Sequence, residues 1–141
     1  MVSNSDRQAV LLAIQPRFAR LIMLGEKKVE FRKVRFRKPV SYAVVYASRP
    51  VQKILGYFEV FYVDEGSPQD LWERYSSAGG VIYEEFQAYY ACSARGIAIG
   101  IGQVWALKEA IPLSMLGSSL RVPQSFMYLK AKAFERILRY A

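Results

Sequence analysis

The chain has 141 residues, of which 52% are hydrophobic and 14% aromatic, and it carries a formal net charge of +8. This length and composition predict one folded domain over residues 1–141 with a hydrophobic core. The single cysteine, Cys92, excludes an internal disulfide, and the absence of histidine excludes Ser-His-Asp and Cys-His catalysis. With no long apolar run and no secretory signal, we expect a cytoplasmic protein without membrane association, metal or cofactor.

The first elements in chain order form a strand, a helix and a second strand. The apolar run 9–14 predicts a buried strand. Pro16 suits the first turn of a helix, and Gly25 suits the position just after its end. Residues 28–33 then alternate apolar and charged side chains, which is typical of a strand with one face toward the core.

The rest of the chain predicts further strands and helices in alternation. Strands are expected at 42–47, 52–64, 95–107 and around 124–129, and helices at 67–78, 83–92 and 130–141. Closely spaced strands favour an antiparallel or mixed sheet of five or six strands that closes toward a barrel, so the predicted class is α+β. The glycines within 95–107 indicate close packing, and Cys92 is expected to be a half-buried helical residue without a catalytic role.

The charges are distributed unevenly along the chain. Residues 1–53 carry a balance of +9, residues 54–94 a balance of −6, and residues 95–141 a balance of +5. A basic beginning and end around an acidic middle predict a polarised surface that suits a polyanion such as RNA.

Glu30 and Arg32 share the polar face of the strand 28–33, opposite Val29 and Phe31. One interpretation is a surface ion pair, which contributes at most about 1 kcal/mol. The other is a site, because the turn at Gly25 leads directly into Lys27 and this pair. We favour a site, in which Glu30 accepts from an exocyclic amine and Arg32 offers its planar fork to a carbonyl or phosphate.

A second basic cluster follows in the segment 33–38. Its cations interleave with Val34 and Phe36, a mixture suited to phosphates and to the faces of bases. The C-terminal segment adds Lys130 and Lys132. A solvated loop is the alternative interpretation.

The motif "GEKKVEFRK" resembles the G-x-K-x-x-E-x-R motif of the ASCH domain family in the PUA-like superfamily. "LLAIQPRFARLIML" before it, and "VYASRPVQKILGYFEV", "EEFQAYYACSARGIAIGIGQV" and "VPQSFMYL" after it, resemble further family segments in the same order. The resemblance covers most of residues 10–130. It implies a small PUA-like β-barrel with surrounding helices and a cleft lined by the motif.

The resemblance to the ASCH domain family implies that the chain binds RNA or modified nucleotides. Together with the basic clusters, it gives a set of candidate nucleic-acid-binding residues. They are Lys27, Lys28, Glu30, Arg32, Lys33, Arg35, Arg37, Lys38, Ser48, Gln124, Ser125, Lys130 and Lys132. The first hypothesis is therefore an RNA-binding module, for single-stranded or structured RNA.

The alternative is a metal-independent hydrolase, with Lys27 and Glu30 as catalytic residues. Some ASCH proteins hydrolyse the amide of acetylcytidine with a lysine, a threonine and a glutamate. Lys27 matches the lysine, but Glu30 stands in place of the threonine, and no carboxylate lies between Glu73 and Glu84 where the glutamate is expected. An acetylcytidine amidohydrolase, a nuclease acting on RNA phosphodiesters, and a regulator that binds protein or DNA all stay open at this point.

Overall fold

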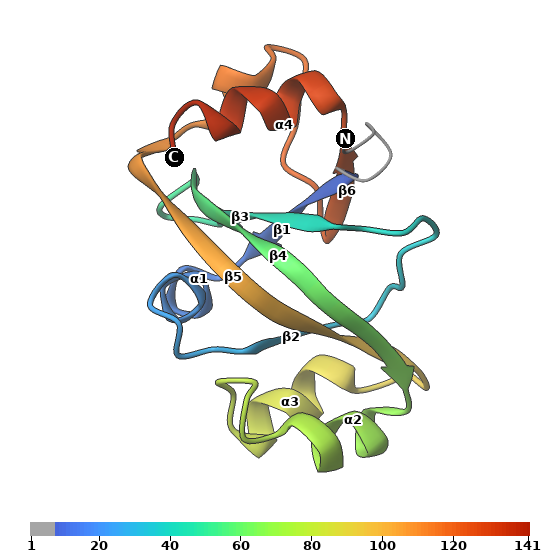
Figure 1. Ribbon diagram of the computed structural model, residues 1–141. Helices are drawn as coiled ribbons and strands as arrows, with labels where there is room; N and C mark the ends of the chain where they lie inside the picture. The colour runs from blue at the N-terminus through green and yellow to red at the C-terminus, as the bar shows by residue number, and fades with distance from the viewer. Residues whose placement is uncertain (1–7) are drawn as a thin grey trace.

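The computed structural model describes residues 8–141, and within them it contains six strands and four α-helices (Figure 1). The strands are β1 (Ala9–Ile14), β2 (Val29–Arg32), β3 (Tyr42–Ala47), β4 (Lys53–Gly66), β5 (Gly96–Ile111) and β6 (Phe126–Leu129). The helices are α1 (Pro16–Met23), α2 (Pro68–Tyr75), α3 (Tyr83–Tyr90) and α4 (Ala131–Leu138), with a short 3-10 turn at Leu113–Leu116. None of the helices in this part of the chain is long and apolar enough to cross a bilayer.

All six strands belong to one sheet in the order β2-β5-β4-β3-β1-β6. Strands β1 and β3 run parallel, and every other neighbouring pair is antiparallel. The sheet curls into a half-barrel whose two edges are β2 and β6 (Figure 1). The predicted α+β class, with a mixed sheet of six strands that closes toward a barrel, is confirmed.

The segment from β1 to β2 forms as its sequence predicts. Pro16 occupies the first turn of α1, and Gly25 follows the helix with a positive φ of 78°, which glycine adopts without steric cost. The backbone N–H groups of Glu26 and Lys27 both donate to the carbonyl of Leu21, so the chain turns tightly into β2.

Helices cover the sheet in separate places (Figure 1). Helix α1 buries Ala19 and Ile22 against β1, β3 and β5. Helix α4 buries Phe134 and Ile137 in a second cluster over β3, β4 and β5. Helices α2 and α3 pack at the far ends of β4 and β5, where Phe86 meets Phe31 of β2 in an edge-to-face contact. Helix α3 is thereby held beside β2.

The glycines of β5 make room for large side chains, as the packing interpretation predicts. A Cβ added at Gly100 would lie 2.1 Å from the ring of Tyr62, and one at Gly96 would lie 2.4 Å from the ring of Tyr90. The register of β4 against β3 shifts beside Gly56, as it does at a β-bulge.

Cys92 differs from its expectation. Helix α3 ends at Tyr90 because Ala91 leaves helical geometry with a ψ of 130°, and the chain then turns back toward β5. Cys92 lies in this turn with a φ of 70° and is exposed, so it is neither helical nor half-buried. Strand β5 also extends to Ile111, beyond the predicted end at 107.

Candidate functional site

Arg32 joins the two edges of the half-barrel. Its Nη1 donates to the carbonyl oxygen of Ala13 on β1 at 3.2 Å, and its Nη2 donates to Ser125 at 2.8 Å to the carbonyl oxygen and 3.0 Å to Oγ. Ser125 comes directly before β6, so one side chain connects the edge strand β2 to the segment that starts the other edge. We call this line of contact the seam.

Three charged side chains are buried together at the seam. Oε2 of Glu30 accepts from Nη1 of Arg32 at 3.0 Å, and Oε1 lies 3.4 Å from Nζ of Lys27. Lys27 also donates to the carbonyl of Gly79, in the loop between α2 and α3. The exposed fractions are 1% for Lys27, 6% for Glu30 and 7% for Arg32. The interpretation of Glu30 and Arg32 as a surface ion pair is therefore wrong, because both side chains are buried away from solvent.

The role expected for Arg32 also requires correction. Its four terminal N–H groups donate to Ala13, Glu30 and the two oxygens of Ser125, so no terminal donor is left for a phosphate or a carbonyl. Its Nε is buried without a hydrogen-bond partner among the residues that the structure describes. Arg32 holds the seam closed and orients Glu30 and Ser125.

Burial lowers the pKa of the Lys27 amine, because desolvation penalises its charged form. The carboxylate of Glu30 acts in the opposite direction, and Arg32 adds a smaller lowering effect on the same pKa. Burial is the largest cause, and the neighbouring Lys28 is itself exposed.

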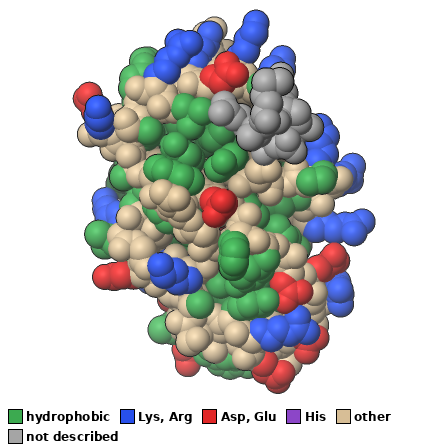
Figure 2. All heavy atoms as spheres, in the orientation of Figure 1, with side chains coloured by type: hydrophobic (Ala, Val, Ile, Leu, Met, Phe, Trp, Pro, Cys, Tyr) green, Lys and Arg blue, Asp and Glu red, His purple; other side chains and the backbone are tan. Residues whose placement is uncertain are grey.

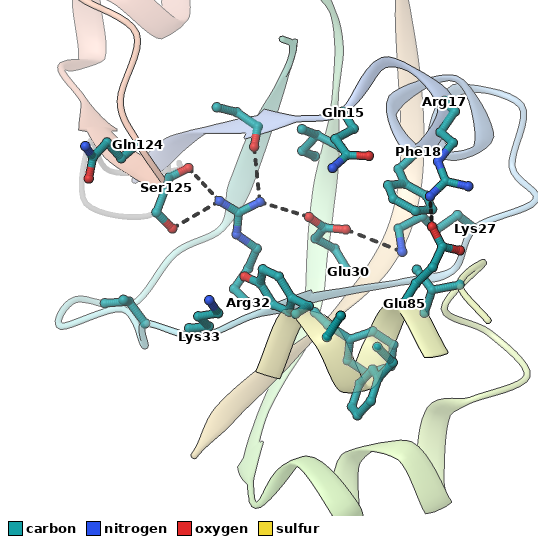
Figure 3. A pocket seen from close by; sticks show the side chains of 18 residues that line it. Gln15, Arg17, Phe18, Lys27, Glu30, Arg32, Lys33, Glu85, Gln124 and Ser125 are labelled. Atoms are coloured by element: carbon teal, nitrogen blue, oxygen red, sulfur yellow. Dashed lines mark hydrogen bonds and ion pairs between the residues drawn. The ribbon is translucent and has the colours of Figure 1, made fainter. Parts of the chain in front are cut away.

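A pocket of about 780 Å³ opens along the seam (Figure 3). Its lining contains the three buried charges with Gln15, Gln124 and Ser125, together with aromatic rings from α1, β2 and α3. The lining residues are Ala13, Ile14, Gln15, Arg17, Phe18, Lys27, Glu30, Phe31, Arg32, Lys33, Val34, Val81, Glu85, Phe86, Ala88, Tyr89, Gln124 and Ser125. A cavity lined by both rings and polar groups suits a planar ligand with a polar edge.

Two side-chain pairs stand at the sides of this pocket. Arg17 of α1 forms an ion pair with Glu85 of α3, which links the two helices (Figure 3). Nζ of Lys33 lies 4.7 Å from the ring centroid of Tyr89. The sequence reasoning missed Arg17, Glu85 and Tyr89. Glu85 and Tyr89 are four residues apart and therefore share one face of α3, but only the fold shows which face meets β2.

Only some of the predicted nucleic-acid-binding residues line this pocket. Lys27, Glu30, Arg32, Lys33, Gln124 and Ser125 line it, whereas Lys28, Arg35, Arg37, Lys38, Ser48, Lys130 and Lys132 do not. Ser48 instead donates its backbone N–H to Ile14 at the end of β1. Lys130 and Lys132 follow β6, and a four-residue strand separates them from Ser125 by roughly 13 Å.

The basic segment 33–38 is anchored rather than free. The hydroxyl of Tyr128 accepts from the backbone N–H groups of Arg37 at 2.8 Å and Lys38 at 3.3 Å. Phe36 packs edge to face on Phe126 with ring centroids 4.9 Å apart. Phe36 is thus half-buried in protein contacts, contrary to the expectation that it faces a base, while the cations at 33, 35, 37 and 38 are exposed.

Comparison with known proteins gives a match over nearly the full length of both chains. An ASCH domain-containing ribonuclease from Zymomonas mobilis is 24% identical over 142 residues, covering 98% of this chain and 95% of that protein. ATP synthase subunit alpha of Ureaplasma parvum is 27% identical over 130 residues, but these cover 92% of this chain and 16% of that subunit. Ribosomal protein uL22 of the same species is 25% identical over 124 residues, which cover 87% of this chain and 40% of that protein. No protein-family model matches the chain.

Solved structures show the same fold. The crystal structure of ASCH from Zymomonas mobilis matches with a TM-score of 0.87 at 23% identity, covering 94% of this chain and 95% of that one. The N-terminal domain of Staphylothermus marinus McrB matches with a TM-score of 0.61 at 9% identity over 94% of each chain. The fold is therefore that of a PUA-like α+β domain. Sequence and structural similarity together confirm the resemblance to the ASCH domain family that the motifs indicate.

Proposed function

We propose that this chain is an RNA-binding domain that receives one nucleotide of a single strand in the seam pocket. The observation that carries the proposal is a cavity of about 780 Å³ that is lined by both rings and polar groups. Phe18 and Tyr89 are half-buried and offer ring surfaces, while Gln15 and Gln124 offer amide groups for a base edge. Proteins that read RNA sequence commonly splay out a single base and use contacts of both kinds.

Cations beside the pocket suit the phosphates of the same strand. Lys33 lines the pocket, and the exposed side chains of Arg35, Arg37 and Lys38 continue from it along the anchored loop. Such contacts supply affinity without sequence preference and weaken with salt. The Zymomonas mobilis relative is named a ribonuclease, which supports RNA as the polyanion.

A second candidate function, metal-independent cleavage of RNA, is favoured by the buried amine of Lys27. A lowered pKa provides a neutral amine at lower pH than a free lysine does, and a neutral amine can accept a proton. In this reaction Lys27 takes the proton of the 2′-hydroxyl, O2′ bonds to phosphorus, and the bond from phosphorus to O5′ breaks. The protonated Lys27 then returns the proton to O5′, leaving a 2′,3′-cyclic phosphate and a 5′-hydroxyl.

The binding proposal is tested by fluorescence anisotropy with labelled single-stranded RNA, duplex RNA and duplex DNA of equal length across a salt series. We expect single-stranded RNA to bind most tightly, with affinity that falls steeply as salt rises. Lys33→Ala should weaken binding and reduce the salt slope by about one, whereas Lys132→Ala, at the far end of β6, should change binding less. Equal and weak binding to all three probes would contradict the proposal.

Cleavage is tested on the same RNA in the presence of a chelator. Mass spectrometry should find a 2′,3′-cyclic phosphate with the wild-type protein and intact RNA with Lys27→Met. If the wild-type protein leaves the RNA intact at concentrations that saturate binding, the cleavage proposal is wrong and the chain is a binding domain without this activity.

A further inference from the structure

A second cavity, of about 300 Å³, lies between α2 and α3. Phe86 lines both this cavity and the seam pocket, so α3 separates the two. Rings, amides and small side chains line the cavity, and among residues 8–141 no lysine or arginine does. The lining residues are Pro68, Gln69, Trp72, Tyr83, Phe86, Gln87, Tyr90, Ala91, Cys92 and Ser93. We call it the α2–α3 groove.

Four of the ten residues that line the groove are aromatic, and of these Trp72 and Tyr83 are the more accessible. The ring of Trp72 packs at tilted angles against Tyr83, with centroids 5.2 Å apart, and against Phe86, with centroids 4.9 Å apart. Tyr83 is 44% exposed, and Trp72 is half-buried. Accessible faces of tryptophan and tyrosine attract cations through their negative π-surfaces, and they also accept an aliphatic stem.

Carboxylates are frequent at this end of the molecule, where α2 also carries Arg74. In Figure 2 acidic side chains gather toward the lower end, where α2 and α3 lie in Figure 1, while Lys and Arg side chains are most frequent at the upper end. Glu73 accepts from Nε2 of Gln69 at 3.0 Å and so lies beside the groove, and Glu84 is next to Tyr83 on α3. Within residues 8–141, neither Glu73 nor Glu84 has a cationic partner within 4.0 Å.

We propose that the α2–α3 groove binds an arginine or lysine side chain of a basic peptide segment in a partner protein. The rings would contact the aliphatic stem and the cation, and Glu73 and Glu84 would attract the charge. The same carboxylates repel phosphates, which disfavours an RNA strand at this site although its bases also stack on aromatic rings. The proposal does not depend on RNA binding at the seam, because Arg17, Lys33 and the loop cations lie outside the groove.

Trp72 provides the signal for a direct test. The chain has two tryptophans, and Trp105 stacks on Tyr57 with ring centroids 4.9 Å apart, away from the groove lining. In the Trp105→Phe protein, Trp72 is the only tryptophan emitter. We expect the acetylated, amidated peptide Gly-Arg-Gly-Arg-Gly to change its emission saturably. The same peptide with citrulline for arginine keeps the shape without the charge and should bind at least about fivefold more weakly.

Charge variants test the carboxylates in the same background. Glu73→Gln combined with Glu84→Gln should weaken binding of the arginine peptide about threefold to tenfold. Glu109→Gln combined with Glu135→Gln removes the same charge from exposed positions on β5 and α4 and should leave binding unchanged. Unfolding midpoints of both double variants check that each is folded. Equal binding of the arginine and citrulline peptides, equal effects of the two double variants, or saturation by oligouridylate in place of the peptide would overturn the proposal.

Discussion

Nζ of Lys27 lies 3.4 Å from Oε1 of Glu30, although the two side chains are only 1% and 8% exposed. The other oxygen of the same carboxylate accepts from Arg32 at 3.0 Å. One buried anion therefore compensates two buried cations. Buried ion pairs contribute little net stability when complete, but removing one partner is costly because the other charge stays buried and unpaired.

Glu30→Gln should therefore destabilise the fold strongly. The substitution keeps the shape of the side chain but leaves Lys27 and Arg32 without their anion, and we expect a loss of about 3–5 kcal/mol in the free energy of unfolding. Urea denaturation followed by circular dichroism measures it. Glu26→Gln, four residues earlier and exposed, is the matched control and should change stability by less than about 0.5 kcal/mol. Similar small effects of both changes would show that the seam does not depend on the buried charges.

Arg32→Lys tests whether the guanidinium closes the seam. Lysine keeps the charge but cannot donate to Ala13, Glu30 and Ser125 together, so we expect a loss of at least about 2 kcal/mol. The backbone N–H of Ala13 donates to the carbonyl of Ser125 at 3.2 Å, at the end of the β1–β6 pairing that Arg32 contacts. Its hydrogen exchange should accelerate in the variant, more than exchange elsewhere in β1.

The exposed Arg35, whose side chain is 72% accessible, provides the control for that substitution. Arg35→Lys should leave both stability and the exchange of Ala13 unchanged. If Arg32→Lys accelerates exchange uniformly across the sheet, the guanidinium contributes global stability without a specific role at the seam.

The lowered pKa of Lys27 predicts a particular dependence of stability on pH. An unfolded lysine titrates near about 10.4, so between the lowered folded pKa and that value the unfolded chain binds more protons than the folded one. Stability should rise with pH in this window, by up to about 1.4 kcal/mol per pH unit. The variant Lys27→Met lacks this contribution.

The measurement is the difference in unfolding free energy between wild type and Lys27→Met from pH 7 to 9.5. Tyrosines with raised pKa values, such as Tyr75 at about 12, act in the opposite direction at higher pH, but they are common to both proteins and cancel. The difference should shift in favour of the wild type as pH rises. A difference that is flat or falls with pH would mean that burial does not control the Lys27 amine.

The sequence predicted the elements of this fold well because their signals are local. Pro16 and Gly25 mark the ends of α1, and Ser67 accepts from the N–H of Asp70 at the start of α2, as an N-cap should. The alternation of apolar and charged residues also predicted which side chains share a face of β2. It did not predict that Glu30 and Arg32 are buried. Their burial depends on the curl of the sheet, which brings the opposite edge against the polar face of β2.

The candidate site was predicted only in part for the same reason. A motif of eight residues identified Lys27, Glu30 and Arg32, but Arg17 and Glu85 meet across the pocket from helices far apart in sequence. The exposed cations at Lys130 and Lys132 belong to the same charge class as Lys33, yet β6 places them away from the seam. The charges in a sequence do not by themselves show which basic residues lie together on one surface of the folded chain.

Gly100→Ala tests the packing of β5 against the rest of the barrel. A Cβ at this position would lie 2.1 Å from the ring of Tyr62, which is stacked on Tyr75 and cannot move freely, so we expect a loss of about 1–3 kcal/mol. Gly66→Ala is the matched control, since its Cβ would meet Leu71 at an ordinary 3.5 Å, and it should be neutral or slightly stabilising. In a Tyr62→Ala background the cost of Gly100→Ala should fall by at least about 1 kcal/mol, because the clash is removed. An unchanged cost in that background would place the effect of Gly100 in its backbone conformation and not in the contact with Tyr62.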